Sequence, residues 1–324
     1  MNKDETKKKK CKKCIGELIY KNDADLKGKP CKVYICDLCG AMSIEKKKGG
    51  VNGTDPARYY DYEEGETFKY NLKVPEGLDH IIIIPLGDVH LGSYFCDVET
   101  FEIWLDWIYE NKHVYVIGMG DLMEIGTQYS YGVFEQNMLA NAQFKQMVDY
   151  LRPIAKEGRL LGLLEGNHEY RIYKKTGFDI VDIMCDMLGC HYYRRGAYLD
   201  IFLKNDDPKK KQNYRFYCLH GSSMAYTKGG KLNALMRLKN VIDADVYCMG
   251  HVHALLHDTD TRYVPVRKNG KLRLEFETKH YILTGAYLKY WGSYAQSKGY
   301  PPSGHGRSPK VKLHSDMDRI SIIE

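Results

Sequence analysis

The sequence predicts an α/β protein with a small, basic, cysteine-rich head. Between residues 80 and 250, short runs of β-branched and aliphatic residues alternate with amphipathic stretches of helical length. This alternation is typical of right-handed βαβ units with parallel strands. Five of the ten cysteines lie within the first 39 residues, apart from this pattern. With 324 residues and 44% apolar content, the chain is long enough for one large core and a small satellite domain.

The first strand is predicted at residues 81–86, an Ile-rich run followed by Gly-Asp, which is typical of a buried strand that leads into a loop. An amphipathic helix is expected at 101–108. The second strand, at 114–117, again precedes Gly-Asp. A longer helix, from about 134 to 155, leads to a third strand at 160–164, which is followed by Gly-Asn-His.

The later part of the chain continues the pattern and then changes to antiparallel strands. We expect a short helix beyond residue 178, strands at 198–203 and 214–219, a helix at 232–241, a strand at 245–249, antiparallel strands after residue 257, and a loop at 299–308. The Gly-, Lys-, Asp- and Tyr-rich stretch that ends near residue 76 is typical of a linker or an extended wrapping segment. The predicted domains are therefore a basic, cysteine-rich head (1–45), a linker (46–78) and a main domain (79–324).

The positive charge of the chain is concentrated in the head. Residues 1–50 contain 14 Lys, no Arg and 7 acidic residues, a net charge of +7, whereas the whole chain is +6 and the remainder is therefore −1. A basic segment attracts nucleic acid by releasing counterions, and lysine-rich termini also serve as solubilising tails. Nucleic acid is therefore the expected partner, with the solubilising role as the alternative.

The sequence shows no sign of membrane insertion. No window approaches the roughly 18 uncharged apolar residues of a membrane span, and no apolar stretch follows the N-terminal lysines as in a signal peptide. We therefore expect a soluble, cytoplasmic protein with no membrane partner. Composition does not predict its oligomeric state.

Four cysteines have the spacing of a structural zinc site. Cys11 and Cys14 form one Cys-x-x-Cys knuckle, and Cys36 and Cys39 form another, with 21 residues between the two knuckles. Four thiolates close a tetrahedral zinc site, so a zinc ribbon is predicted. Cys31 could replace one ligand or be a buried spare thiol. Such ribbons occur on nucleic-acid machinery and also as protein-docking modules.

Polar clusters follow five of the expected strands. Since ligands bind at the carboxyl ends of strands in open α/β sheets, the clusters should converge on one site. They offer oxygen and nitrogen donors, which suit Mn, Fe or Zn, and two adjacent ions need about seven or eight ligands with a shared carboxylate. The clusters are Asp88-Val89-His90, Gly120-Asp121, Gly166-Asn167-His168-Glu169, His220-Gly221 and Gly250-His251-Val252-His253.

In this order the clusters resemble the five motifs of the calcineurin-like metallophosphoesterases, over residues 81 to about 255. The resemblance implies an αββα sandwich of two mixed sheets flanked by helices, and two divalent ions, manganese first with iron or zinc as alternatives. One ion would be held by Asp88, His90, Asp121 and His253. The other would be held by Asn167, His220 and His251, with Asp121 bridging. The other histidines are interpreted as structural: His80, His113, His191, His257, His280, His305 and His314.

The expected reaction is phosphoester hydrolysis by a hydroxide that bridges the two metals. His168 is not needed as a ligand, so it is expected to protonate the leaving oxygen or to stabilise the transition state. Glu124 lies where phosphoprotein phosphatases of this family place an aspartate, and it is expected to orient His168. A site of this kind can also bind metal without catalysis.

Departures from the family pattern indicate the substrate class. Phosphoprotein phosphatases of the family carry two arginines that clamp a phosphoryl dianion, and both are absent here. Met123-Glu124-Ile125-Gly126 stands in place of their Val-Asp-Arg-Gly run, and Glu165 precedes Gly166. Arg171 could provide a substitute clamp or be an ordinary surface arginine. The Asp-Val-His-Leu-Gly run at 88–92 resembles the recombination-nuclease branch. The prediction is a phosphodiesterase, nuclease-like on DNA or RNA; the alternatives are a phosphatase for a phosphoprotein or small-molecule monoester, and a catalytically silent zinc-ribbon adaptor.

Overall fold

The computed structural model describes residues 9–10, 17–26, 29–36, 38–39, 42–46, 65–128, 130, 132–204, 212–302 and 306–323. The chain forms two units, 1–62 and 63–324. The described part of the first unit is an antiparallel sheet of four strands in sequence order: β1 (Lys9–Lys10), β2 (Glu17–Leu26), β3 (Lys29–Cys36) and β4 (Met42–Lys46).

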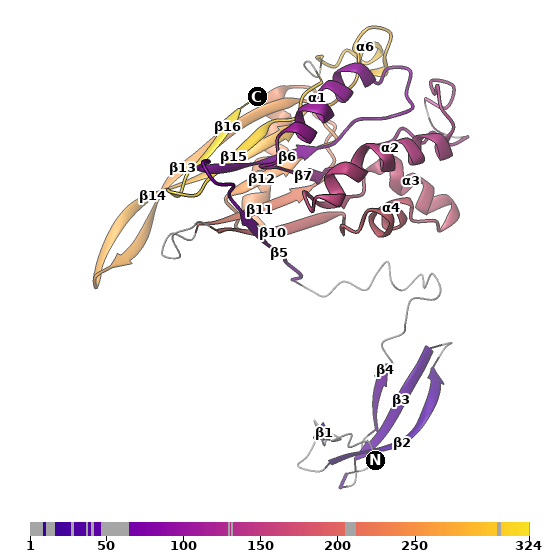
Figure 1. Cartoon of the computed structure of the whole chain (residues 1–324), viewed down its shortest axis with the longest axis vertical. Coiled ribbons are helices and arrows are strands. Elements are labelled where there is room, and N and C mark those ends of the chain that lie inside the picture. Colours follow the sequence, from indigo (N-terminus) through magenta and orange to yellow (C-terminus); the bar gives the residue numbers. More distant parts are fainter. Residues whose placement is uncertain are drawn as a thin grey trace. The chain divides into compact units, whose positions relative to one another are not determined.

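The second unit contains two six-stranded mixed sheets (Figure 1). In the first sheet, a parallel set of four strands is extended by two antiparallel ones. Its order is β16 (Ile320–Ile323), β15 (Lys310–His314), β6 (His80–Leu86), β7 (Val114–Gly118), β8 (Leu160–Leu164) and β9 (His191–Arg194). The order in the second sheet is β13 (Leu255–Lys268), β14 (Lys271–Thr284), β12 (Val246–Met249), β11 (Gln212–Leu219), β10 (Gly196–Lys204) and β5 (Phe68–Lys73).

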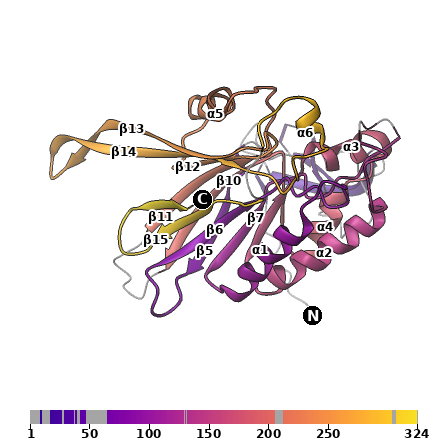
Figure 2. The ribbon, with the colours of Figure 1, turned by 90° about the horizontal axis from the view of Figure 1, so that it is seen from above.

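Helices cover the outer faces of both sheets (Figure 2). They are α1 (Val98–Glu110), α2 (Ala140–Lys156), α3 (Asn167–Thr176), α4 (Ile180–Leu188), α5 (Lys228–Met236), which continues as a 3-10 turn (Arg237–Asn240), and α6 (Tyr294–Ser297). The apolar core lies in three layers: between the first sheet and α1, α2 and α4, between the two sheets, and between the second sheet and α5.

Strand β6 shows how the sequence produces these layers. Alternate residues of a strand point to opposite faces of the sheet. Ile82 and Ile84 pack in the helix-side layer, whereas Ile81 and Ile83 pack between the sheets. Because both faces are buried, the strand is a continuous apolar run rather than an alternating one. The prediction of an α/β protein with two mixed sheets and flanking helices is confirmed.

Several elements differ from the sequence prediction. The long helix expected from residue 134 begins at Ala140, because residues 132–136 form turns in which Glu135 donates its N–H to the carbonyl of Gly132. Strand β9 and helix α3 were not expected. Strand β5 lies inside the segment predicted as a linker or wrapping strand, and it pairs in parallel with β10. The hairpin of β13 and β14 turns at Asn269-Gly270, where both residues have positive φ (51° and 74°), as two-residue hairpin loops require.

Among the described residues, we find no helix whose length and apolar content would allow it to cross a membrane.

A histidine pair in the second sheet should make stability depend on pH. His257 and His280 stack with ring centroids 5.4 Å apart. Burial, followed by the nearby His257, lowers the pKa of His280 to about 4. An unfolded histidine titrates near 6.5, so between about pH 6.5 and 4 the unfolded chain binds a proton that the folded chain does not. This contribution to the free energy of unfolding is therefore present above about pH 6.5 and is lost as the pH falls from about 6.5 to 4.

We expect His280→Gln to remove this part of the acid destabilisation, which amounts to about 3 kcal/mol at most. The free energy of unfolding, measured with urea from pH 7 to 4, should depend less on pH in the variant than in the wild type. His191→Gln, at an exposed histidine, is the matched control and should keep the wild-type slope. Equal slopes for His280→Gln and the wild type would contradict the assignment.

Candidate metal centre

The five polar clusters lie just beyond the carboxyl ends of five strands in the two sheets. Asp88 and His90 follow β6, Asp121 follows β7, Asn167 and His168 follow β8, His220 follows β11, and His251 and His253 follow β12. The structure brings the seven predicted metal ligands together in two adjoining groups.

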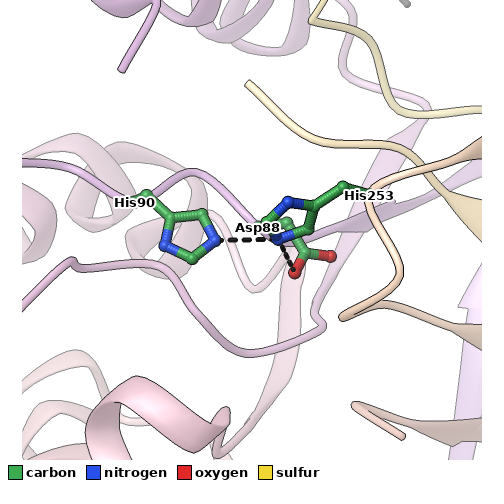
Figure 3. Close-up of side chains that lie close together, drawn as sticks. All are labelled: Asp88, His90 and His253. Carbon is green, nitrogen blue, oxygen red and sulfur yellow. Dashed lines mark hydrogen bonds and ion pairs between the residues drawn. The ribbon is translucent and has the colours of Figure 1, made fainter. Parts of the chain in front are cut away.

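The first group contains Asp88, His90 and His253 (Figure 3). The Nε2 atoms of His90 and His253 are 3.1 Å apart, and His253 Nε2 is 3.4 Å from Asp88 Oδ1. Asp88 and His90 are buried, whereas His253 is partly accessible. Two ring nitrogens and a carboxylate oxygen thus converge on one point.

The second group contains Asp121, Asn167, His220 and His251. His220 Nε2 lies 3.2 Å from Asp121 Oδ2 and 3.1 Å from Asn167 Oδ1. The same amide oxygen is 2.6 Å from His251 Nδ1. The main-chain carbonyl of Met119 can only accept, so His220 donates Nδ1–H to it over 2.8 Å and, when neutral, presents the Nε2 lone pair to the group.

Asp121 lies between the two groups. Its Oδ2 is 3.2 Å from His220 Nε2 and 3.9 Å from His90 Nε2, and its Oδ1 accepts from the backbone N–H of His168 over 2.8 Å. That N–H belongs to the first turn of α3, where backbone donors have no helical partner and favour an anion. The side chain is buried, so its carboxylate occupies the position expected of a bridging ligand.

The charges of the centre favour a bound cation. Burial alone would raise the pKa of Asp121, but His220 and His168 hold it well below its usual value. Burial would likewise lower the pKa of His220, yet Asp121 and Asp88 raise it to about 10. The carboxylates are therefore ionised, and their negative charge is balanced by protons on imidazoles, which a divalent metal displaces when it binds. The oxygen and nitrogen donors fit Mn, Fe or Zn.

The backbone at the centre is strained. A positive φ is uncommon for residues other than glycine, and such residues cluster at functional sites. Five of the seven candidate ligands have a positive φ: Asp88 (50°), His90 (52°), Asp121 (49°), His251 (66°) and His253 (47°). The loops after β6, β7 and β12 thus hold conformations that local preference alone would not select.

Glycines allow the loops to approach one another. A Cβ atom on Gly250 would lie 2.8 Å from Asp88 Oδ2, and one on Gly166 would overlap the backbone nitrogen and the carboxylate of Asp121. Neither position leaves room for a side chain without displacing a candidate ligand. The backbone N–H of His251 also donates to both oxygens of Asp88, at 3.0 and 2.9 Å, which joins the loop after β12 to the loop after β6.

Glu169 belongs to the Gly166-Asn167-His168-Glu169 motif, but no role was predicted for it from the sequence. It is buried, and its carboxylate accepts N–H bonds from Asp121 (3.0 Å), Met123 (3.1 Å) and Gly166 (3.0 Å). Burial, and then the charge of Asp121, raises the pKa of Glu169 to about 7. Glu169 therefore joins the loop after β7 to the start of α3. In the sequence, Glu169 directly follows Gly-Asn-His, which could have drawn attention to it. The residues of the loop after β7 whose N–H groups it accepts lie 46 and 48 residues away along the chain.

Glu169→Gln is expected to destabilise the protein by about 1–3 kcal/mol, because the amide replaces one acceptor oxygen by an NH₂ group that faces backbone donors. The urea midpoint at about pH 8, where the carboxylate is mostly ionised, should fall with an unchanged slope. Glu110→Gln, at an exposed position on α1, should leave the midpoint unchanged. If Glu169→Gln unfolded at the same urea midpoint as the wild type, these hydrogen bonds would make no net contribution to the free energy of unfolding.

His168 lies beside the two groups and, with His90 and Asp121, forms a third set of side chains whose ligand atoms lie within 4.8 Å of one another. Its Nε2 is 3.9 Å from Asp121 Oδ2, and its Nδ1 donates to the main-chain carbonyl of Glu124 over 2.7 Å. Burial lowers the pKa of His168. The Glu124 carboxylate is 3.5 Å from His168 Nδ1 but 3.1 Å from His90 Nδ1. Glu124 thus contacts both histidines, and its closest contact with His168 is through the backbone; the roles of both residues stay predictions.

Arg171 is partly buried on α3, and its Nη1 donates to Ser130 Oγ over 2.8 Å. Burial raises the pKa of Glu124, but His90, then His168 and then the positive charge of Arg171 lower it, so the guanidinium lies near the centre. A substrate contact for Arg171 stays a prediction.

The zinc-ribbon prediction involves residues that are only partly described. Cys11 and Cys14 lie outside the described residues. Cys36 ends β3 and is buried, and Cys39 follows it in a turn and is exposed. Cys31 lies on β3. The structural zinc ion therefore stays a prediction.

No family model matches the chain, and neither does any curated protein. The chain is similar to solved structures of Vps29 from Entamoeba histolytica. A double mutant of Vps29 has 13% sequence identity and a TM-score of 0.31, with 75% of this chain and 98% of that chain covered. Wild-type Vps29 in complex with zinc has 13% identity and a TM-score of 0.30, with the same coverage.

Proposed function

We propose that this protein is a dinuclear metal-dependent phosphoesterase of the calcineurin-like kind that hydrolyses phosphodiester bonds, nuclease-like, in DNA or RNA. The observation that supports this most is the position of Asp121. Its buried carboxylate lies between the group of Asp88, His90 and His253 and the group that contains His220. Two adjoining sets of oxygen and nitrogen donors with a shared carboxylate are what a pair of divalent ions requires.

The proposed ligands divide as the two groups do. Asp88, His90 and His253 would hold one ion, Asn167, His220 and His251 the other, and Asp121 both. Manganese is the first candidate, with iron or zinc as alternatives, and a separate structural zinc is proposed for the four head cysteines. When bound, such ions supply Lewis acidity and a water nucleophile whose pKa is close to neutral.

His168 is the proposed proton donor to the leaving oxygen. Its Nδ1–H bond to the Glu124 carbonyl fixes the ring, so the proton exchanged with the substrate would be held at Nε2. Burial lowers the pKa of that ring, and the charge of Asp121 opposes this effect. The side chain is 15% exposed, which leaves one edge accessible to a substrate.

A diester is proposed over a monoester because the centre offers few cationic side chains for a phosphoryl dianion. Arg171 is the residue predicted as a possible substitute for the two missing arginines of the family, and its guanidinium is bonded to Ser130. A phosphodiester carries a single negative charge per phosphate and has less need of a bidentate clamp.

The direct test compares two esters with the same leaving group. We expect manganese-dependent hydrolysis of bis-p-nitrophenyl phosphate at a higher kcat/KM than that of p-nitrophenyl phosphate. A preference for the monoester would exclude the diesterase and favour a phosphatase. No hydrolysis of either ester with manganese, iron or zinc would favour the silent adaptor.

Nucleic acid is proposed as the substrate and the basic head as a contributor to its binding. Affinity for DNA should fall with salt, and the chain without residues 1–50 should bind more weakly and with a smaller salt dependence. Thermal unfolding of the shortened chain controls for its folding. Equal affinities for the two chains would contradict a role of the head in binding.

A further inference from the structure

A second cluster of metal-ligating side chains lies at the opposite end of β6 from the candidate metal centre. Asp79 precedes β6, His314 ends β15, and Asp316 lies in the loop between β15 and β16. One ligand atom from each residue lies within 4.8 Å of the other two. Since β6 has seven residues, roughly 20 Å of strand separate this cluster from Asp88, which follows the other end.

Strand pairing brings the three residues together. β15 runs antiparallel to β6, and His314 stands opposite His80, so the end of β15 meets the start of β6. Ser315 then donates to the carbonyl of Asp79 through both its backbone N–H (2.8 Å) and its hydroxyl (3.0 Å). The hydroxyl of the buried Tyr214 lies 2.6 Å from the carbonyl of His314 and 3.0 Å from that of Met317. The loop is therefore held in place independently of any ion.

The contacts of His314 determine which ring nitrogen faces the carboxylates. Its Nε2 lies 3.3 Å from Ser321 Oγ, whereas its Nδ1 is 3.9 Å from Asp79 Oδ2, which is too far for a hydrogen bond. The tautomer with its proton on Nε2 satisfies that proton with Ser321. It leaves a lone pair on Nδ1, the ring nitrogen that lies 3.9 Å from Asp79 Oδ2.

The cluster brings metal-ligating atoms together from three side chains. The His314 ring is buried, and its Nδ1 lies 3.9 Å from Asp79 Oδ2. His80 Nδ1 lies 2.5 Å from the other oxygen of Asp79, Oδ1, which leaves Oδ2 on the side of His314. An imidazole lone pair and two carboxylates then face one another with acceptors alone. A cation would satisfy all three.

We propose that Asp79, His314 and Asp316 bind a divalent first-row transition metal ion, zinc first, at a site independent of the proposed dinuclear centre. Imidazole together with carboxylates favours such a metal over calcium or magnesium, which take oxygen ligands. Zinc binds these atoms at about 2.0–2.2 Å, so a tetrahedral ion holds its ligand atoms roughly 3.4 Å apart. The 3.9 Å between His314 Nδ1 and Asp79 Oδ2 needs to shorten only slightly.

The burial of the three side chains allows that adjustment. His314 is buried and held by Ser321, whereas the Asp79 side chain is 57% exposed and Asp316 is exposed, so the carboxylates can move onto the ion. Water would complete the coordination. Ser321 and His80, which contact His314 and Asp79, are the outer partners that orient the ligands. The bound ion would fasten the loop between β15 and β16 to the start of β6.

Crystals of the full chain soaked with zinc chloride provide the first test. Anomalous scattering at the zinc edge should give a peak between His314 Nδ1 and the carboxylates of Asp79 and Asp316. Absence of this peak while other zinc peaks are present, or absence of every peak at saturating zinc, would overturn the proposal. Peaks at the dinuclear centre are assessed separately, so the result can contradict one proposed metal site without contradicting the other.

Zinc content in solution provides the second test. After equilibrium dialysis at a fixed zinc concentration, Asp316→Asn and His314→Gln should each contain one zinc fewer per chain than the wild type. Asp316 is exposed, so its variant should remain folded even if the buried His314 does not tolerate replacement. Ser321→Ala keeps the three ligands and should weaken binding about tenfold. Asp318→Asn makes the same charge change in the same loop and should keep the wild-type content. Wild-type zinc content in Asp316→Asn, or an equal loss in Asp318→Asn, would overturn the proposal.

Discussion

Replacing Asp121 by Asn is expected to lower kcat/KM for bis-p-nitrophenyl phosphate by about a thousandfold or more. Asp121 lies between the two ligand groups, 3.2 Å from His220 and 3.9 Å from His90. The amide keeps the shape of the side chain but removes the negative charge that two cations would share. Bound metal supplies several kcal/mol of transition-state stabilisation, and each 1.36 kcal/mol lost costs about a factor of ten.

The measurement combines initial rates in manganese with the manganese content of the purified variant. We expect at least one equivalent to be lost together with activity. Asp106→Asn makes the same change at an exposed position on α1 and should leave both unchanged. If Asp121→Asn retained more than about a tenth of the wild-type rate, the carboxylate would not be a shared ligand and the proposed centre would be wrong.

The positions of these ligands could be predicted because they depend on local signals. Asp88 and Asp121 each follow a short apolar run that ends in glycine and a polar residue, a pattern that marks the end of a buried strand. Parallel strands bring their carboxyl ends to one edge of a sheet, which gathers the clusters after β6, β7 and β8 in the first sheet and those after β11 and β12 in the second. The order of the strands and helices and the periodicity of the apolar residues thus predict this part of the site.

The remaining features depend on distant contacts that periodicity does not encode. Glu169 acts on backbone N–H groups of the loop after β7, and the carboxylate of Glu124 lies closer to His90 than to His168. His314 was interpreted as structural because it is a lone histidine in the sequence. Its proximity to Asp79 results from the antiparallel pairing of β15 with β6, two segments more than 200 residues apart.

His168→Ala is expected to lower kcat/KM for a dinucleotide by about 10²–10⁴-fold while the bound manganese is retained. The retention follows from the proposed role of His168 as a proton donor, because its Nδ1 is bonded to the Glu124 carbonyl and its ring is not among the seven proposed ligands. Loss of the ring should therefore remove a proton donor and leave the two ligand groups in place. His253→Ala is the contrasting variant, because its Nε2 lies within 3.4 Å of both His90 Nε2 and Asp88 Oδ1, and it should lose metal together with activity.

The leaving group distinguishes a proton donor from a residue that only stabilises negative charge. A p-nitrophenolate ion leaves readily without a proton, whereas the alkoxide of a nucleoside requires one. If His168 donates that proton, His168→Ala should reduce the rate much less with bis-p-nitrophenyl phosphate than with the dinucleotide. Equal losses on the two substrates would instead assign His168 to stabilisation of charge on the phosphoryl oxygens, since that charge develops whichever group leaves. If the manganese content of His168→Ala fell together with its activity, His168 would be a metal ligand. Its ring would then have to be added to one of the two ligand groups that Asp121 joins.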